Sequence, residues 1–349
     1  MTKETSYISE LSVISTICVV YMHLCGFHGM IPQCNFEWIL SLFIEKVCFF
    51  AVPVFFMITG ATLIDYPKRY NFKTYVKKRI KKTVIPWLSW GGVSFVYYLI
   101  FNFDLIENLK LNKVVNGILN NEYRSIYWFF PVMISVYICL PLFAYVDEAK
   151  KSKIFSYLII VGILFNIILP DINSVFKIGI DVPIKVPVVS EYLIYVLTGY
   201  LISHNNTKNK NVEKIIYASG IIALAIQIIG TGVLSLQLGY ESKLFRETTI
   251  LSYCYATSVF VFFKNKSGII MNNNKLKKLI EFMKNYTLPI YLIHQYANNL
   301  VQKILMMLGY NSEGRVMYQL LGPVVAVTLS IFCTWIIRKI PVIKKIVPQ

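Results

Sequence analysis

The sequence predicts an all-α polytopic membrane protein of about ten transmembrane helices, packed in one bundle around a central polar cavity. Of its 349 residues, 56% are hydrophobic and the mean hydropathy is +0.56, whereas soluble domains are about half apolar at most. Residues 11–31 hold no charged side chain, and about 20 apolar residues cross a bilayer as a helix. We expect residues 1–349 to form a single integral membrane domain without a soluble catalytic domain.

Ten apolar segments are the expected spans. They cover residues 8–28, 38–64, 84–103, 126–146, 154–170, 186–203, 214–233, 246–263, 285–308 and 317–338. The first is expected to remain uncleaved, because no small-residue cleavage site follows it. In the second, Pro53 should kink the helix and Gly60 should permit close helix packing. We also expect a short surface helix within 104–125 and an interfacial amphipathic helix within 264–284.

The basic residues predict the orientation of these spans. The net charge of +17 in a soluble chain would suggest a nucleic-acid partner, but here the cations lie between apolar runs, so we expect none. A cytoplasmic N-terminus places 25 Lys and Arg residues inside and eight outside, as the positive-inside rule requires. We therefore expect a multi-pass protein of the cell membrane with both termini in the cytoplasm.

A polar stripe runs along the first span and ends at His23. At about 100° per residue, Ser12 and Thr16 share a face with His23. An ionisable side chain at membrane depth is a functional-site hypothesis by default. The alternative is a packing histidine that is hydrogen-bonded to a neighbouring helix.

The ninth span repeats this pattern around His294. Polar residues recur there at spacings of three and four, which places them on one face of a helix: Thr287, Tyr291, His294, Gln295, Asn298 and Gln302. Two polar stripes with one histidine each predict a wet cavity between the two spans. A chain of hydrogen bonds between helices is the alternative.

Depth arithmetic places a carboxylate near His23. His23 lies roughly 8 Å, and Glu45 roughly 10 Å, below the outer ends of their antiparallel spans. We expect Glu45 to pair with His23 and thereby determine which of its two ring nitrogens is free. We expect the Lys46 side chain to reach outward. Glu191 and Arg124 also fall near the external side, which suits an extracytoplasmic acceptor.

Residues 77–82 form the densest basic cluster of the chain, at the cytoplasmic end of the third span. Its cations are Lys77, Lys78, Arg79, Lys81 and Lys82. One interpretation is a topology determinant that also attracts anionic membrane lipid. The other is a docking surface for a phosphate-rich cytosolic ligand. The seven cysteines show no metal-ligand spacing, and no metal site is expected.

These motifs together resemble the acyltransferase-3 family of bacterial integral membrane acyltransferases, over essentially the whole length. Its VVxxH pattern is matched by Val19, Val20 and His23, and its VPxFFxISG pattern by Pro53, Phe55, Phe56, Ile58 and Gly60. Its basic RRxxRxxxP segment is similar to the stretch that carries Arg79, Lys82 and Pro86. YWFF and PLF resemble its HLWFL element, and YLIH carries its late histidine onto His294.

Two positions depart from the family pattern. Ser12 stands where the family usually has an arginine, and Ile126 where it often has a histidine. Either another cation, such as Arg124 or Lys46, replaces the arginine, or the chain belongs to a divergent branch.

The resemblance implies transfer of an acyl group, most often acetyl, from cytoplasmic acyl-CoA as co-substrate to a hydroxyl of a cell-surface glycan or its lipid-linked oligosaccharide precursor. No permanently bound cofactor is expected. His23 would be the general base or a transient acyl carrier, assisted by Glu45 and His294. The expected donor-binding residues are Lys78, Arg79, Lys82 and Trp128. The expected acceptor-binding residues are Tyr291, Gln295, Glu191 and Arg124.

Two other functions fit the same residues. In a transporter or flippase of a lipid-linked sugar, the polar stripes would line a pathway. A non-catalytic relative that lost the arginine would serve as a scaffold. Binding of labelled acyl-CoA distinguishes the enzyme from both.

Overall fold

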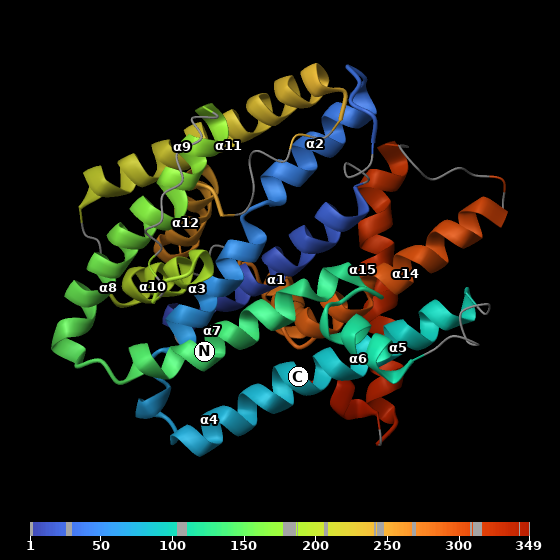
Figure 1. Ribbon diagram of the computed structural model, residues 1–349, viewed down its shortest axis with the longest axis horizontal. Helices are drawn as coiled ribbons and strands as arrows, with labels where there is room; N and C mark the ends of the chain where they lie inside the picture. Colours follow the sequence, from blue (N-terminus) through green and yellow to red (C-terminus); the bar gives the residue numbers. More distant parts are fainter. Residues whose placement is uncertain are drawn as a thin grey trace. The chain divides into compact units, whose positions relative to one another are not determined.

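The computed structural model describes residues 3–25, 30–102, 110–176, 186, 188–205, 209–240, 242, 248–266, 270–307, 309, 316–341 and 343–348. Their regular secondary structure is helical, and these ranges contain no strand (Figure 1). The all-α prediction is therefore confirmed. Parts of the expected spans (26–28, 103, 187, 246–247 and 308) and most of the 170–186 loop lie outside the described residues.

Seven helical segments among the described residues are long and apolar enough to cross a membrane. They are Ser6–Leu24, Phe36–Lys68, Phe72–Ile100, Ser125–Ala144, Glu148–Asn173, Lys210–Leu238 and Val316–Lys339. The protein is thus a polytopic membrane protein, as predicted. The remaining three expected spans are helices too, either shorter or more polar: α10 (Glu191–His204), α12 (Ile250–Asn265) and α14 (Thr287–Met307).

The chain divides into two compact units. Unit 1 comprises Met1–Leu63 and Val146–Ser330, and unit 2 comprises Ile64–Tyr145 and Ile331–Gln349. The helix α15 (Val316–Lys339) supplies residues to both. The sequence pattern did not predict this division.

In unit 1, α1 (Lys3–Leu24) is followed by α2 (Phe36–Cys48) and α3 (Ala51–Leu63). The expected second span is thus broken after Cys48. Pro53 lies in the first turn of α3, where its missing N–H leaves no helical hydrogen bond unmade. The interruption at residues 49–50 lies close to Pro53, and the kink at this proline stays a prediction.

Glycines allow α3 and α10 to pack with their backbones in contact. A Cβ atom on Gly60 would lie 1.8 Å from the carbonyl oxygen of Val196, and one on Gly199 would lie 2.1 Å from that of Met57. Neither helix could approach so closely with a larger residue, because the obstacle is backbone rather than a side chain. The predicted packing role of Gly60 is confirmed.

The remaining helices of unit 1 follow in chain order. They are α8 (Glu148–Gly162), a π-helical turn (Ile163–Ile168), α9 (Leu169–Phe176), α10, α11 (Lys210–Leu238), α12, α13 (Asn274–Met283) and α14. The α11 and α12 helices are joined by the buried side chain of Gln227, whose Nε2 donates to Ser252 Oγ at 2.8 Å. The helix α13 is the element expected within 264–284.

Unit 2 contains a long, interrupted helix. It comprises α4 (Phe72–Arg79), a π-helical turn (Ile80–Val84) and α5 (Ile85–Ile100). Pro86 has no N–H to donate to the carbonyl four residues earlier, and the wider turn accommodates this loss. Because the helix starts at Phe72 rather than at 84, the basic cluster is itself helical.

The other elements of unit 2 are α7 (Phe129–Ala144) and several short helices. The short helices are the 3-10 turns Tyr66–Lys68, Ser125–Trp128 and Lys344–Ile346, and α6 (Leu111–Leu119). The helix α6 is the surface helix expected within 104–125. Tyr75 stacks on Tyr66 with ring centroids 4.2 Å apart and donates to the Tyr137 carbonyl at 2.7 Å, which connects α4 to α7.

Candidate functional site

The helices α1 and α14 bring His23 and His294 together. Their ring centroids are 5.4 Å apart and their planes are inclined by 27°, so the imidazoles are stacked. His294 is fully buried, whereas His23 is half-buried. The polar faces of the two spans therefore meet at their histidines, and the catalytic roles of these side chains stay predictions, as does the cavity.

Backbone carbonyls hold the His294 ring in one orientation. Its Nδ1 lies 2.8 Å from the carbonyl oxygen of Tyr291 and 3.1 Å from that of Ile290. Carbonyl oxygens only accept, so Nδ1 carries a hydrogen and the lone pair of the neutral ring lies on Nε2.

The neighbours of His294 on α14 are those expected to bind substrate. The Tyr291 ring centroid lies 6.1 Å from that of His294, and Gln295 follows directly as a half-buried side chain. One turn later, Tyr318 of α15 hydrogen-bonds to Asn298. The polar face of α14 thus continues beyond the histidine pair.

Lys46 corrects one expectation. Its Nζ lies 3.0 Å from Glu45 Oε1 and 4.5 Å from the Phe49 ring centroid, and both charged side chains are buried. The prediction that Lys46 reaches outward is wrong. Near the end of α2, the long lysine side chain can fold back onto its own neighbours, which neutralises a charge that apolar surroundings would penalise. The pairing of Glu45 with His23 stays a prediction.

A hydrogen bond defines the register of α1 against α2. Ser41 Oγ donates to the Cys25 carbonyl at 2.9 Å, and the two helices are antiparallel because they form a hairpin. Glu45, four residues after Ser41 on α2, is therefore level with Tyr21, four residues before Cys25 on α1. Tyr21 is two residues from His23. Glu45 therefore lies within about 3 Å of the level of His23 along the helix axis, and the buried ion pair is at the depth of the histidines.

Sequence reasoning missed the contribution of α15 to this region. Gln319 is buried, and its Nε2 donates to Ser41 Oγ at 2.7 Å. The Tyr21 hydroxyl donates to the Leu320 carbonyl at 3.0 Å. The available signal was an amide within the apolar segment 317–338, where a polar side chain is expected to face a protein partner.

The expected donor-binding residues lie in unit 2. Lys78 and Lys82 are exposed, and Lys78 Nζ lies 4.0 Å from the Tyr70 ring centroid. The Arg79 guanidinium lies 5.1 Å from the Tyr137 ring centroid, and its Nε is buried without a hydrogen-bond partner among the described residues. Trp128 is half-buried just before α7. The segment thus presents several cations to solvent, held against tyrosine rings.

The two remaining acceptor candidates fall in different units. Glu191 begins α10 in unit 1, directly after the Ser190 cap. Arg124 is in unit 2, with its guanidinium 5.4 Å from the Tyr97 ring centroid. Within unit 1, the candidate site therefore comprises the histidine pair with its neighbours on α2 and α14. The described residues contain no group of three or more His, Cys, Asp or Glu that could hold a metal ion.

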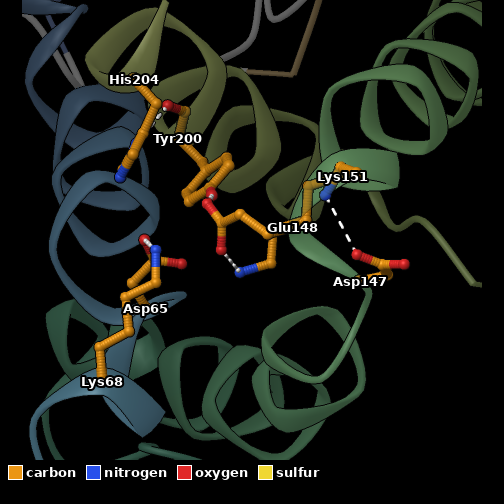
Figure 2. A network of polar contacts seen from close by, with 8 residues as sticks. Asp65, Lys68, Asp147, Glu148, Lys151, Tyr200 and His204 are labelled. Carbon is orange, nitrogen blue, oxygen red and sulfur yellow. Dashed lines mark hydrogen bonds and ion pairs between the residues drawn. The ribbon is translucent and has the colours of Figure 1, made fainter.

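A second polar cluster, which the sequence analysis did not predict, joins α8 to α10. Figure 2 shows the Tyr200 phenol directed toward Glu148, to which it donates at 3.2 Å, and the His204 ring stacked on Tyr200 with centroids 4.0 Å apart. Lys151 is buried and lies 3.2 Å from Glu148 Oε2. Its Nζ also lies 5.4 Å from the Tyr200 ring centroid of α10, so Lys151 contacts both helices rather than facing solvent. Figure 2 also draws the ion pair of Asp65 and Lys68 within unit 2.

Comparison with known proteins gives one informative match. A family model described as an acyltransferase domain, that of the acyltransferase-3 family, matches residues 11–337, from α1 through α15. Neither the curated proteins nor the solved structures give a significant match. The family model spans nearly the whole chain, including both histidines of the stacked pair. The chain therefore belongs to the acyltransferase-3 family and is a membrane acyltransferase.

Proposed function

We propose that this protein is an O-acyltransferase that moves an acyl group, most simply acetyl, from acyl-CoA to a hydroxyl of a cell-surface polysaccharide or its lipid-linked precursor. We place the donor on the cytoplasmic side of the cell membrane and the acceptor on the outer side. The observation that carries the proposal is the stacked pair of His23 and His294, 5.4 Å apart, within a chain of this family.

His23 is the proposed general base. An alcohol is a weak nucleophile at neutral pH and needs a positioned base, for which imidazole is well suited. His23 takes the hydroxyl proton as the oxygen attacks the thioester carbonyl, and the C–S bond then breaks to release the CoA thiol, which regains the proton. His23 rather than His294 is chosen because it is the more accessible ring.

His294 and its neighbours orient the reacting groups in this proposal. His294 is fixed by two carbonyls, so its Nε2 lone pair can accept a hydrogen bond from His23 or from the acceptor hydroxyl with little reorganisation. Tyr291 and Gln295 contact the acceptor or the thioester oxygen, and Glu191 and Arg124 contact the acceptor toward the outer side. A transient acyl group on His23 is the alternative course of the same reaction.

Lys46 is the proposed substitute for the family arginine. Ser12 occupies that position, and its carbonyl accepts a hydrogen bond from the Thr16 hydroxyl at 2.8 Å within α1. Lys46 is a buried cation whose neighbour Glu45 is at the depth of His23. Lys46 would thus provide a buried cation near this depth without an arginine on α1.

The donor phosphates are assigned to the basic segment of unit 2. Arg79 offers a planar fork for bidentate contacts with phosphate, and Lys78 and Lys82 offer point charges. Trp128 is assigned to the donor as well. These cations are exposed or half-buried, so a polyphosphate ligand can reach them from water.

Binding of radiolabelled acetyl-CoA to the purified protein in detergent tests this assignment. The variant Arg79→Gln/Lys82→Gln is expected to bind at least tenfold more weakly, because each charge-assisted hydrogen bond contributes about 1.5–3 kcal/mol. The matched control Lys110→Gln/Lys113→Gln removes two exposed charges elsewhere in unit 2 and should bind normally. If the unaltered protein binds no acetyl-CoA, a transporter or a non-catalytic relative becomes the better interpretation.

A further inference from the structure

We propose that α13 is a binding surface for anionic phospholipid at the membrane boundary. The inference is independent of the acyl-transfer proposal, because it concerns a different surface of unit 1. It rests on where α13 is anchored, on which of its faces are exposed and on its charge.

A buried carboxylate anchors the start of the α13 segment to α1. Glu10 is fully buried, and its Oε1 accepts hydrogen bonds from the backbone N–H groups of Ile270 at 3.2 Å and Met271 at 3.0 Å. Glu10 lies about 6 Å along the helix from Ser6, where this candidate span begins. The attachment is therefore within about one helical turn of the end of a candidate membrane span.

The sides of α13 differ in what they contact. Ile280 and Met283 are buried against the protein, whereas Leu276, Leu279 and Phe282 are 44%, 49% and 48% exposed. Three large apolar side chains that are about half exposed on a ten-residue helix are typical of an interfacial helix. The apolar face of such a helix inserts between the headgroups and the acyl chains of the membrane.

Lysines flank the exposed apolar side chains. At about 100° per residue, Lys275 projects between Leu279 and Phe282, and Lys278 lies about 40° beyond Phe282. Lysine stems can run along the apolar boundary while their ammonium groups reach the phosphate layer. This arrangement fits a phospholipid, whose acyl chain and phosphate are contacted by neighbouring side chains.

The charge balance selects an anionic lipid. Residues 264–284 contain six lysines and one acidic residue, Glu281, and Lys275, Lys277, Lys278 and Lys284 are exposed. Each basic residue close to an anionic membrane surface strengthens binding by about 1 kcal/mol, or about fivefold. A zwitterionic lipid has no net charge to exploit this, and free phosphate has no acyl chain to contact Leu279 and Phe282.

The position of α13 links such a lipid to both histidine-bearing helices. Three residues, Lys284–Tyr286, separate α13 from α14, which carries His294. Through Glu10, the same segment is attached to α1, which carries His23. Lipid bound along α13 would therefore stabilise the attachment of these two helices to each other.

Lipid retention by the purified full-length protein tests the proposal. The protein is exchanged into detergent micelles containing equal amounts of radiolabelled phosphatidylglycerol and phosphatidylcholine, and the bound lipids are counted after gel filtration. We expect a preference for phosphatidylglycerol that falls with added NaCl, since exposed charges are screened by salt. The variant Lys275→Gln/Lys277→Gln/Lys278→Gln should lose up to about 100-fold in phosphatidylglycerol affinity.

Matched variants distinguish binding at α13 from a general effect of the positive charge of the protein. The control Lys150→Gln/Lys210→Gln/Lys214→Gln removes three exposed lysines elsewhere in unit 1 and should retain the preference. In Leu279→Ser/Phe282→Ser, retention of both lipids should fall although all lysines remain. The proposal is overturned if the two triple variants behave alike, or if the unaltered protein retains both lipids equally. A thermal melt of each variant verifies folding, and no readout depends on acyl transfer.

Discussion

A charged side chain within a membrane span has to be neutralised where it stands, and Glu45 and Lys46 show how single residues achieve this. Both are buried, and they form an ion pair of 3.0 Å. The pair gains little over an apolar replacement, but the loss of one partner leaves an uncompensated buried charge. The free energies of unfolding of single and double variants therefore show whether the two side chains act as a pair.

Unfolding of purified Glu45 and Lys46 variants provides the first prediction. Glu45→Gln and Lys46→Met should each lower the free energy of unfolding by about 3–5 kcal/mol. The double variant Glu45→Gln/Lys46→Met should recover most of that loss, because no unpaired charge remains. Guanidinium titrations in detergent give the three values. Additive losses would show that the two side chains do not act as a pair.

The residues of the candidate site were predictable only in part. Polar residues on one face of two apolar helices indicated that His23 and His294 share an environment, since such faces avoid lipid. The contact of Lys46 with Glu45 was missed because adjacent residues point about 100° apart on an ideal helix, and a flexible stem near a helix end can overcome that difference. Gln319 was missed because nothing in its local sequence indicates which helix it meets.

At the level of elements, the packing of α3 against α10 depends on two glycines, which have no Cβ atom. Gly60 and Gly199 each leave room for a carbonyl oxygen of the opposite helix. Small residues at such positions let helices approach closely, and close approach is a main source of helix association in membranes. The α3–α10 pair is therefore the part of unit 1 that tolerates added volume least.

Alanine substitutions at glycines provide the second prediction. Gly60→Ala and Gly199→Ala should each destabilise the protein by about 1–3 kcal/mol, because overpacking against a backbone atom forces the helices apart. Gly92→Ala is the matched control, since a Cβ atom there meets nothing within 4 Å and alanine favours a helix over glycine. Melting temperatures in detergent should fall for the first two and stay level or rise for the third. Equal melting temperatures would contradict the packing argument.

One element boundary lies close to a residue that the sequence analysis singled out. Pro53 predicted an irregularity in the second span, and the chain breaks between α2 and α3 near it, whereas Pro141 and Pro323 lie inside α7 and α15. The π-helical turns at Ile80–Val84 and Ile163–Ile168 were not predicted. The residues before and after a π-helical turn keep the periodicity of an α-helix. The spacing of apolar residues therefore does not reveal where such a turn lies.

For the whole molecule, the distribution of lysine and arginine predicts orientation. Cys34 lies between the first two spans, so this orientation predicts that it is outside. It is exposed, whereas the other six cysteines are buried or half-buried. The same argument places Lys345, which is also exposed, in the cytoplasm. Both termini are then expected in the cytoplasm.

Labelling of intact cells with a membrane-impermeant maleimide provides the third prediction. Cys34 should react in intact cells, and Cys34→Ser should abolish that labelling. In Cys34→Ser/Lys345→Cys, the introduced cysteine should react only after the membrane is permeabilised. The reverse pattern would place the N-terminus outside and contradict the orientation.

The family, the all-α class and the membrane location were predictable from composition and motif order, because these properties are distributed along the whole chain. The division into two units was not, since it depends on contacts between segments far apart in sequence. It places the histidine pair in one unit and the basic segment in the other.

The acyl-transfer rate of His23→Gln tests the central claim most directly. Purified protein in liposomes is supplied with acetyl-CoA labelled in its acetyl group and with an extract of cell-surface polysaccharide or its lipid-linked precursor, and the label in the glycan is counted. Glutamine keeps hydrogen-bonding capacity but cannot act as a base, so the rate should fall by about 10²–10⁴, with acetyl-CoA binding unchanged. His204→Gln, which alters a histidine outside the stacked pair, should keep the normal rate. Transfer by His23→Gln at the rate of the unaltered protein would contradict the account.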